Sequence, residues 1–231
     1  MVIMTEYEAR ILLAEHALAY VGVKEGSELH SLLVEKYNQI KPLPRYFEMT
    51  VDLPWCAMFV SVIAAMTNML DIIPAECSCE YMIEGFRKLK RWREDENYKP
   101  QIGDICFYDW QDSGIGDDTG EADHVGIVTR VWESSFMVTE GNYSDAVKNR
   151  ELKVNAQYLR GFGIPDFKGW AERYNESNAP KPSSWAKDAV AWAVENGISD
   201  GKRLQQNASR EEVLTFLYRY NNTFGGKHES K

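Results

Sequence analysis

The sequence has no long apolar run, and it is poor in the residues that build metal sites and disulfide frameworks. No stretch approaches the roughly 18 apolar residues of a membrane-spanning helix, so we expect no membrane partner. Residues 1–6 lack the basic and apolar segments of a signal peptide, which predicts synthesis in the cytoplasm. Four cysteines without such a signal favour free thiols over disulfides.

The sequence also lacks an excess of positive charge. Its 231 residues include 26 Lys and Arg against 35 Asp and Glu, a formal net charge of −9. Binding to phosphate backbones needs clustered Lys and Arg, so nucleic acid is not expected as a partner. The length suggests one medium domain with an appendage or two small domains, and a hydrophobic content of 44% is ample for a core.

A candidate nucleophile lies in the apolar stretch from Trp55 to Val60. Asp52 and Pro54 precede this stretch, and these residue types favour a helix N-cap and first turn. Cys56 should therefore lie in the opening turn of a buried helix. Unpaired N–H groups and the helix dipole favour a thiolate at that position, and the thiolate is the nucleophilic form.

A cysteine nucleophile needs a base and a group that orients the base. The sequence contains only four histidines, and His124 begins an apolar run that predicts a buried strand. A second predicted strand, residues 136–139, runs into Glu140 and Asn142. The order of cysteine, histidine and polar orienting group is typical of papain-type cysteine peptidases.

Four segments together resemble a CHAP domain, a cysteine- and histidine-dependent amidase or peptidase domain that cleaves bacterial peptidoglycan. They are WCAMFV at 55–60, GDICFYDW at 103–110, DHVGIV at 123–128 and EGN at 140–142. The resemblance covers residues 5 to 166. It implies an α+β, papain-like fold in which N-terminal helices pack on an antiparallel sheet.

The same resemblance implies the site and its chemistry. Cys56 would be the nucleophile, His124 the general base, Glu140 the orienting group and Asn142 a polar support, without a cofactor. The substrate would be an amide bond of peptidoglycan, and many phage lysins carry such a domain. Three other functions stay open: a related NlpC-type γ-D-glutamyl peptidase, a non-catalytic wall-binding or structural protein, and a cytosolic amidase or acyltransferase that acts on a small molecule.

Residues 109–123 contain five aspartates among three glycines. The fixed ligand spacing and the terminal bidentate Glu of an EF-hand are missing, so no metal site is expected. We predict an acidic loop beside the active-site cleft. Residues 77 and 79 are cysteines separated by one residue, a spacing that rarely makes a relaxed disulfide, and they are expected to be buried or cleft-lining thiols.

The C-terminal region shows a different pattern. Trp185 begins one predicted helical face, and Ser209 with Glu212 forms a capping box before a second face. The two helices resemble an S-layer homology (SLH) repeat, in which the corresponding segment helps to bind secondary cell-wall polymers. By this resemblance the candidate wall-binding residues are Ser209, Arg210 and Glu211, together with Trp185.

These patterns predict four parts of the chain. They are a catalytic domain at 1–168, a polar linker at 169–182, an SLH-like helical segment at 183–222 and a flexible tail at 223–231. A single repeat of roughly 40 residues buries too little surface to be stable alone, so it should pack on the catalytic domain or self-associate into a homo-oligomer. A wall substrate would be reached after release by host, phage or prophage lysis.

Overall fold

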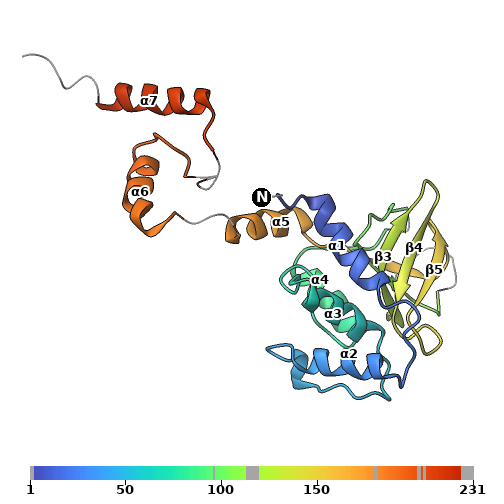
Figure 1. The fold of residues 1–231 in the computed structure, drawn as a ribbon. Helices are drawn as coiled ribbons and strands as arrows, with labels where there is room; N and C mark the ends of the chain where they lie inside the picture. Colours follow the sequence, from blue (N-terminus) through green and yellow to red (C-terminus); the bar gives the residue numbers. More distant parts are fainter. Residues whose placement is uncertain are drawn as a thin grey trace, which may run out of the picture. The chain divides into compact units, whose positions relative to one another are not determined.

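The protein is described here by a computed structural model that covers residues 3–95, 97–112, 120–178, 182–201, 204 and 207–224. The chain divides into two compact units, Met1–Glu172 (unit 1) and Arg173–Lys231 (unit 2). Unit 1 combines helices with one antiparallel sheet, which confirms the predicted α+β, papain-like fold (Figure 1). None of the described helices is long and apolar enough to span a membrane.

The helices that precede the sheet of unit 1 come first in the chain, as the resemblance implies. They are α1 (Glu6–Leu18), α2 (Glu28–Asn38), the short 3-10 helix η1 (Pro44–Tyr46), α3 (Cys56–Met66) and α4 (Cys79–Lys88). Thr5 and Glu8 form a capping box at the start of α1, where each side chain binds the other residue's backbone N–H.

The sheet has six strands, and every pair of neighbours is antiparallel, in the order β1-β6-β2-β3-β4-β5. The strands are β1 (Trp92–Arg93), β2 (Ile105–Tyr108), β3 (His124–Val131), β4 (Ser135–Glu140), β5 (Lys148–Lys153) and β6 (Leu159–Gly163). The strands predicted to begin at His124 and to span residues 136–139 are confirmed as β3 and β4.

Residues alternate between the two faces of the sheet, as the two-residue period of a strand requires. Ile105 and Phe107 of β2 belong to the main hydrophobic core, which α1 and α3 cover. Cys106 and Tyr108 belong to a smaller cluster on the opposite face. Figure 1 shows the helices of unit 1 on one side of the sheet. Cys106 is therefore a buried sheet residue.

Asp104, the first of two aspartates in the GDICFYDW segment, ties the first helix to the sheet. Asp104 is fully buried and accepts hydrogen bonds from Arg10 Nη1 (3.1 Å), Tyr98 Oη (2.7 Å) and the Gln101 backbone N–H (2.8 Å). A buried carboxylate is tolerated only when it is paired and hydrogen-bonded in this way. Asp104 therefore has a structural role.

The predicted linker at 169–182 is wrong in part, because α5 (Phe167–Ser177) runs through its first half and across the boundary between the units. Trp170 is buried, and its indole Nε1 donates to the Asn68 carbonyl oxygen (2.8 Å). Burial of this aromatic residue continues the chain as a helix where a polar composition predicted a loop. Residues 179–181 lie outside the described part of the chain.

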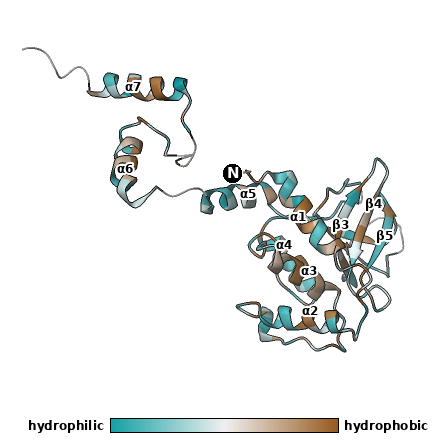
Figure 2. Ribbon diagram, in the orientation of Figure 1, coloured by the Kyte–Doolittle hydropathy of each residue, from teal (hydrophilic) through white to brown (hydrophobic). Residues whose placement is uncertain are grey.

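Unit 2 contains the 3-10 helix η2 (Ser184–Ala186), α6 (Lys187–Glu195) and α7 (Arg210–Phe224). Trp192 of α6 contacts Tyr220 and Phe224 of α7, with ring centroids 6.3 and 5.3 Å apart. Ile198 is the one buried hydrophobic residue among those described in this unit. Figure 2 shows hydrophobic and hydrophilic residues along α7.

Two predictions for unit 2 need correction. Trp185 lies in η2, before α6 begins, and is 87% exposed, so it does not continue the predicted helical face. Residues 223 and 224 were assigned to a flexible tail but form the last turn of α7, where Phe224 stacks against Trp192. Residues 225–231 lie outside the described residues.

Candidate active site

Cys56 is the first residue of α3 and is 7% exposed, which confirms its predicted place in the opening turn of a buried helix. Trp55, not Asp52, is the residue that precedes the helix, so the predicted Asp cap is wrong. The Asp52 carboxylate instead accepts a hydrogen bond from Thr50 Oγ1 (2.6 Å).

The start of α3 is decided by the anchoring of Trp55. Its indole is fully buried, donates from Nε1 to Glu25 Oε2 (2.9 Å) and packs against the His30 ring, with centroids 4.6 Å apart. The first N–H groups of a helix have no acceptor within the helix, and they point toward its N-terminus. Cys56 therefore lies where a negative charge is stabilised.

His124 begins β3 and lies between the nucleophile and a carboxylate. Its Nε2 is 3.0 Å from Glu140 Oε2, and an interaction with Cys56 raises the pKa of its imidazole. Because Glu140 engages Nε2, Nδ1 is the ring nitrogen that is left to interact with Cys56. The structure thus brings Cys56, His124 and Glu140 together in the predicted sequential order, from a helix start, a strand start and a strand end.

Glu140 is fully buried at the end of β4, where three polar side chains bind its carboxylate. Arg150 donates to it twice, from Nε to Oε1 (2.8 Å) and from Nη2 to Oε2 (3.0 Å), and Tyr108 Oη donates to Oε1 (2.7 Å). A two-point guanidinium contact holds a carboxylate in one orientation. Arg150 and Tyr108 therefore position Glu140 toward the imidazole.

Neither positioning residue was found from the sequence. Arg150 lies on β5 opposite Val138, on the same face as Glu140, and Tyr108 lies on β2 opposite His124. The one available signal was the expected strand pairing, since residues two apart on a strand share a face. Without the register of β4 and β5, that signal does not single out Arg150.

The environment shifts the pKa values of the three groups in directions that favour charge. Burial raises the pKa of Glu140, but hydrogen bonds from His124 and Arg150 outweigh it and hold the pKa below its usual value. Burial lowers the pKa of His124, but contacts with Cys56 and Glu140 raise it to about 9. Hydrogen bonds from Cys79 and His124 lower the pKa of the Cys56 thiol. The arrangement favours a thiolate–imidazolium pair.

A second thiol lies beside the nucleophile. The Sγ of Cys79, the first residue of α4, is 3.7 Å from the Sγ of Cys56. A hydrogen bond to Cys56, together with burial, raises the pKa of Cys79 well above the usual thiol value. Sequence analysis expected a buried or cleft-lining thiol at this position but not its contact with Cys56.

An aromatic group continues from the site toward solvent. Trp110 stacks on Tyr108, with centroids 5.1 Å apart and planes at 19°, and it lies 6.0 Å from the His124 ring. The Arg150 guanidinium lies over Trp110 and Tyr143. Trp110 is 41% exposed, so its ring is available to contact a substrate at His124.

Two glycines allow the strands of the site to approach closely. A Cβ at Gly126 would lie 2.7 Å from Glu140 Cγ and 2.6 Å from Val138 Cγ1. A Cβ at Gly141 would lie 2.5 Å from Phe59 Cβ, on the helix that carries the nucleophile. The glycines in the DHVGIV and EGN segments are therefore required by packing around Glu140.

Asn142 takes a left-handed backbone conformation, with φ of 56°, which Asn tolerates better than most residues. Its side chain forms no hydrogen bond with any of the residues that the structure describes. Its role as a polar support therefore stays a prediction.

The acidic segment 109–123 is ordered by backbone contacts where it is described. Asp109, Asp112 and Asp123 each accept a hydrogen bond from a backbone N–H. Asp117 and Asp118 lie outside the described residues. In the part of the chain that the structure covers, no group of three or more His, Cys, Asp or Glu side chains could hold a metal ion.

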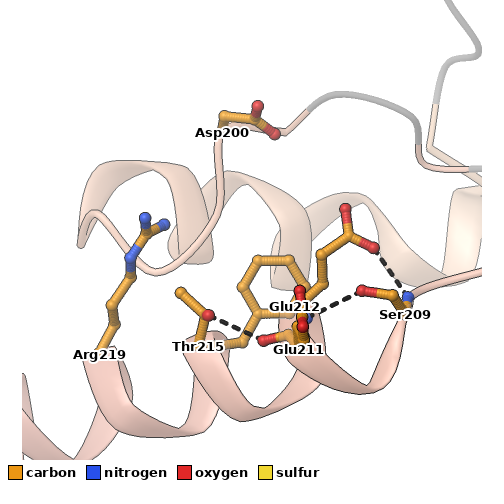
Figure 3. Close-up of a pocket in the computed structure, with 7 residues that line it drawn as sticks. Asp200, Ser209, Glu211, Glu212, Thr215 and Arg219 are labelled. Atoms are coloured by element: carbon orange, nitrogen blue, oxygen red, sulfur yellow. Dashed lines mark hydrogen bonds between the residues drawn. The ribbon is translucent and has the colours of Figure 1, made fainter.

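The candidate wall-binding residues of unit 2 are only partly brought together. Ser209 and Glu211 line a pocket, shown in Figure 3, together with Asp200, Glu212, Thr215, Phe216 and Arg219. Arg210 and Trp185 are not among the lining residues. Ser209 and Glu212 also form the predicted capping box of α7, so part of this polar group stabilises the helix start.

Comparison with protein families matches residues 48–142 to the CHAP domain. This part of the chain is therefore similar to a CHAP domain. The matched range holds Cys56, His124, Glu140 and Asn142, whereas Arg150 and all of unit 2 lie beyond it. No curated protein and no solved structure matches the chain.

A CHAP domain implies, in general, a hydrolase or amidase type of activity on peptidoglycan. Such domains are typically cysteine-dependent amidases or endopeptidases, in agreement with the thiol and imidazole that the structure places in contact. The SLH resemblance of unit 2 stays a prediction.

Proposed function

We propose that the protein is an endolysin-like peptidoglycan hydrolase that cleaves an amide bond in the stem peptide or the cross-bridge. The observation that carries the proposal is the buried relay of Cys56, His124 and Glu140 within a CHAP domain. The relay contains a nucleophile, a base and an orienting carboxylate, which are the parts needed for acyl transfer.

In the first half of the reaction the Cys56 thiolate attacks the amide carbonyl carbon. The backbone N–H of Cys56, at the start of α3, helps to stabilise the oxyanion that forms. His124 then gives its Nδ1 proton to the leaving amine, and a thioester remains on Cys56. Glu140, held by Arg150, keeps the imidazole oriented and stabilises its charged form.

In the second half His124 acts as a base. It takes a proton from water, which attacks the thioester carbonyl and releases the carboxylate product from Cys56. The raised pKa of His124, about 9, keeps the proton on the imidazole until the amine leaves.

Unit 2 has a proposed role in wall binding. Its pocket carries Ser209 and Glu211, and its helices expose several aromatic and aliphatic side chains. Such a surface suits a secondary cell-wall polymer or a second copy of the chain, which fits the expected homo-oligomer. The net charge of −9 disfavours electrostatic adhesion to an anionic wall, so recognition would depend on the shape of the site. Action on the wall would follow release from the cell in which the protein is made.

The proposed activity is tested by digestion of purified Gram-positive peptidoglycan with the wild type, Cys56→Ala and Cys77→Ala, followed by mass analysis of the fragments. Cys77 is the matched control, because it is a free cysteine whose Sγ contacts Arg45 rather than His124. The wild type and Cys77→Ala should release fragments, and Cys56→Ala should not.

The new end groups of the released fragments identify the bond that is cleaved. A free L-Ala amine indicates an amidase, and any other new amine indicates an endopeptidase; cleavage next to γ-D-glutamate would assign the NlpC-type activity. If the wild type digests no wall, or Cys56→Ala digests as well as the wild type, the proposed hydrolase activity is wrong. A non-catalytic wall-binding role would then explain retention on walls.

Wall binding is measured separately by sedimentation with walls that retain or lack their secondary polymers. Ser209→Ala combined with Glu211→Ala should reduce the bound fraction on intact walls. Thr223→Ala, an exposed position near the other end of α7, is the control and should bind as the wild type does. Equal binding to both kinds of wall would contradict the polymer as ligand.

A further inference from the structure

The closest approach between two thiols among the described residues involves the nucleophile itself. Cys56 and Cys79 are the first residues of α3 and α4, two helices that pack together, and their Sγ atoms are 3.7 Å apart. A disulfide joins its sulfurs at about 2.05 Å, so a shift of roughly 2 Å would bring this pair to bonding distance. Each residue is 7% exposed, which leaves a narrow access for a small oxidant.

The two thiols differ in their surroundings, as an attacking and a resolving thiol should. Cys56 contacts His124, which favours its thiolate, the form that peroxides oxidise. Cys79 lies near the carboxylates of Glu80 and Asp123, which disfavour a second thiolate. Glu80 also accepts a hydrogen bond from the Ala122 N–H (2.6 Å), which fastens the start of α4 beside the strand that begins with His124.

The other two cysteines are held elsewhere. Cys77 Sγ is 3.3 Å from Arg45 Nη2, and Cys106 is buried in the cluster on the opposite face of the sheet. Position in the fold therefore singles out Cys79 as the thiol that can reach Cys56.

We propose that Cys56 and Cys79 form a reversible disulfide when a peroxide oxidises the nucleophile, and that this modification switches the active site off. The thiolate of Cys56 attacks one oxygen of hydrogen peroxide and displaces hydroxide, which gives a sulfenic acid. The sulfur of Cys79 then attacks the Cys56 sulfur, and the sulfenic oxygen leaves as water with the Cys79 proton. Two thiols and one peroxide thus become one disulfide and two waters.

The disulfide has two consequences for the site. It occupies the sulfur that would attack the substrate, and it protects that sulfur from further oxidation to sulfinic acid, which thiol reductants do not reverse. Loss of wall digestion on oxidation rests on the proposed hydrolase function, whereas formation of the disulfide does not.

The test uses the full-length wild type, Cys79→Ser and the control Cys77→Ser, each treated with hydrogen peroxide and then with dithiothreitol. Peptide mass analysis should find Cys56 joined to Cys79 in the wild type and in Cys77→Ser, with the mass of two hydrogens lost. Wall digestion by these two proteins should fall by at least about tenfold and return with reductant. In Cys79→Ser, the loss should persist after reductant, and Cys56 should carry sulfinic acid.

Each variant is compared with its own reduced rate, because Cys79 also hydrogen bonds to the nucleophile. Cys79→Ala provides a second variant, and thermal unfolding of the reduced proteins shows whether they are folded. Absence of the Cys56–Cys79 peptide from the oxidised, folded wild type would overturn the inference, as would full recovery of both Cys79 variants.

The outcomes also separate this inference from the proposed function. If the two cysteines crosslink but the reduced protein digests no wall, the thiol pair stands and the hydrolase proposal fails. If the reduced protein digests walls but never crosslinks, only the disulfide inference fails.

Discussion

The helices of the two units look alike in sequence but differ in what covers them. In α1 of unit 1, residues on one face, including Ala9 and Leu13, are fully buried against the sheet and α3. In α7 of unit 2, Val213 and Leu217 recur with similar spacing, yet no described residue of that helix is buried. Helical periodicity therefore predicts a helix but not the surface that covers its apolar face.

This difference in burial matters for function, because buried side chains are held in fixed positions. In unit 1 the main core packs α3 against β3, and β4 pairs with β3 in the sheet, so Cys56, His124 and Glu140 come together. In unit 2 the exposed apolar side chains leave surface available to a ligand or to another copy of the chain. Burial in unit 1 gives the precision that chemistry needs, whereas binding by unit 2 stays a proposal.

The difference in burial between the two units is tested most strongly by a Leu→Ala substitution in a helix of each unit. Leu13→Ala should lower the free energy of unfolding by about 2–5 kcal/mol, because it removes a fully buried side chain. Leu217→Ala should change it by less than about 0.5 kcal/mol, because Leu217 is 59% exposed. Urea denaturation followed by circular dichroism measures both. A large loss for Leu217→Ala that depends on protein concentration would show that α7 is covered by another copy.

A second prediction concerns the support of the catalytic carboxylate in unit 1. Arg150→Gln should lower kcat/KM on wall fragments about 10- to 100-fold, since a buried carboxylate loses a charged two-point partner. Arg150→Lys should recover only part of the rate, because an ammonium cannot make the same two-point contact. Arg130→Gln, an exposed position near the end of β3, serves as the control and should keep the wild-type rate. An unchanged rate for Arg150→Gln would show that Glu140 needs no positioning.

The pH profile provides a third prediction. The pKa of His124 is raised to about 9, so protonated His124 is available below that pH and is lost above it; the alkaline limb of kcat/KM should lie near pH 9. Glu140→Gln removes the negative charge that stabilises the imidazolium, so this limb should move to lower pH by about one unit. A limb that stays in place in the variant would mean that another group titrates there.

The smallest predicted effect compares two capping boxes. Thr5→Ala and Ser209→Ala each remove a side-chain acceptor at a helix start and should cost about 1 kcal/mol. In unit 1 the loss should appear as lower global stability, because packing keeps α1 helical. In unit 2 it should appear as faster amide exchange in the first turn of α7. If the first turn of α7 exchanges its amide hydrogens equally slowly in the wild type and in Ser209→Ala, the expected fraying is contradicted.

Local signals in the sequence predicted much of the fold. The capping box of α7 and the strands β3 and β4 were found from short-range patterns. The prediction failed where tertiary contacts changed a local preference. Burial of Trp55 moved the start of α3 past Asp52, and burial of Trp170 made a helix of a polar segment.

The sequence by itself determined that Cys56 lies in the opening turn of a helix, that a strand starts at His124 and that both precede Glu140, because each depends on residues close in the chain; the resemblance to a CHAP domain implied the α+β class. Only the tertiary structure decided that Arg150 and Tyr108 hold Glu140 and that Cys79 touches Cys56. These contacts join residues 10, 32 and 23 positions apart, respectively. They depend on strand register and on helix packing, which no local pattern of residues specifies.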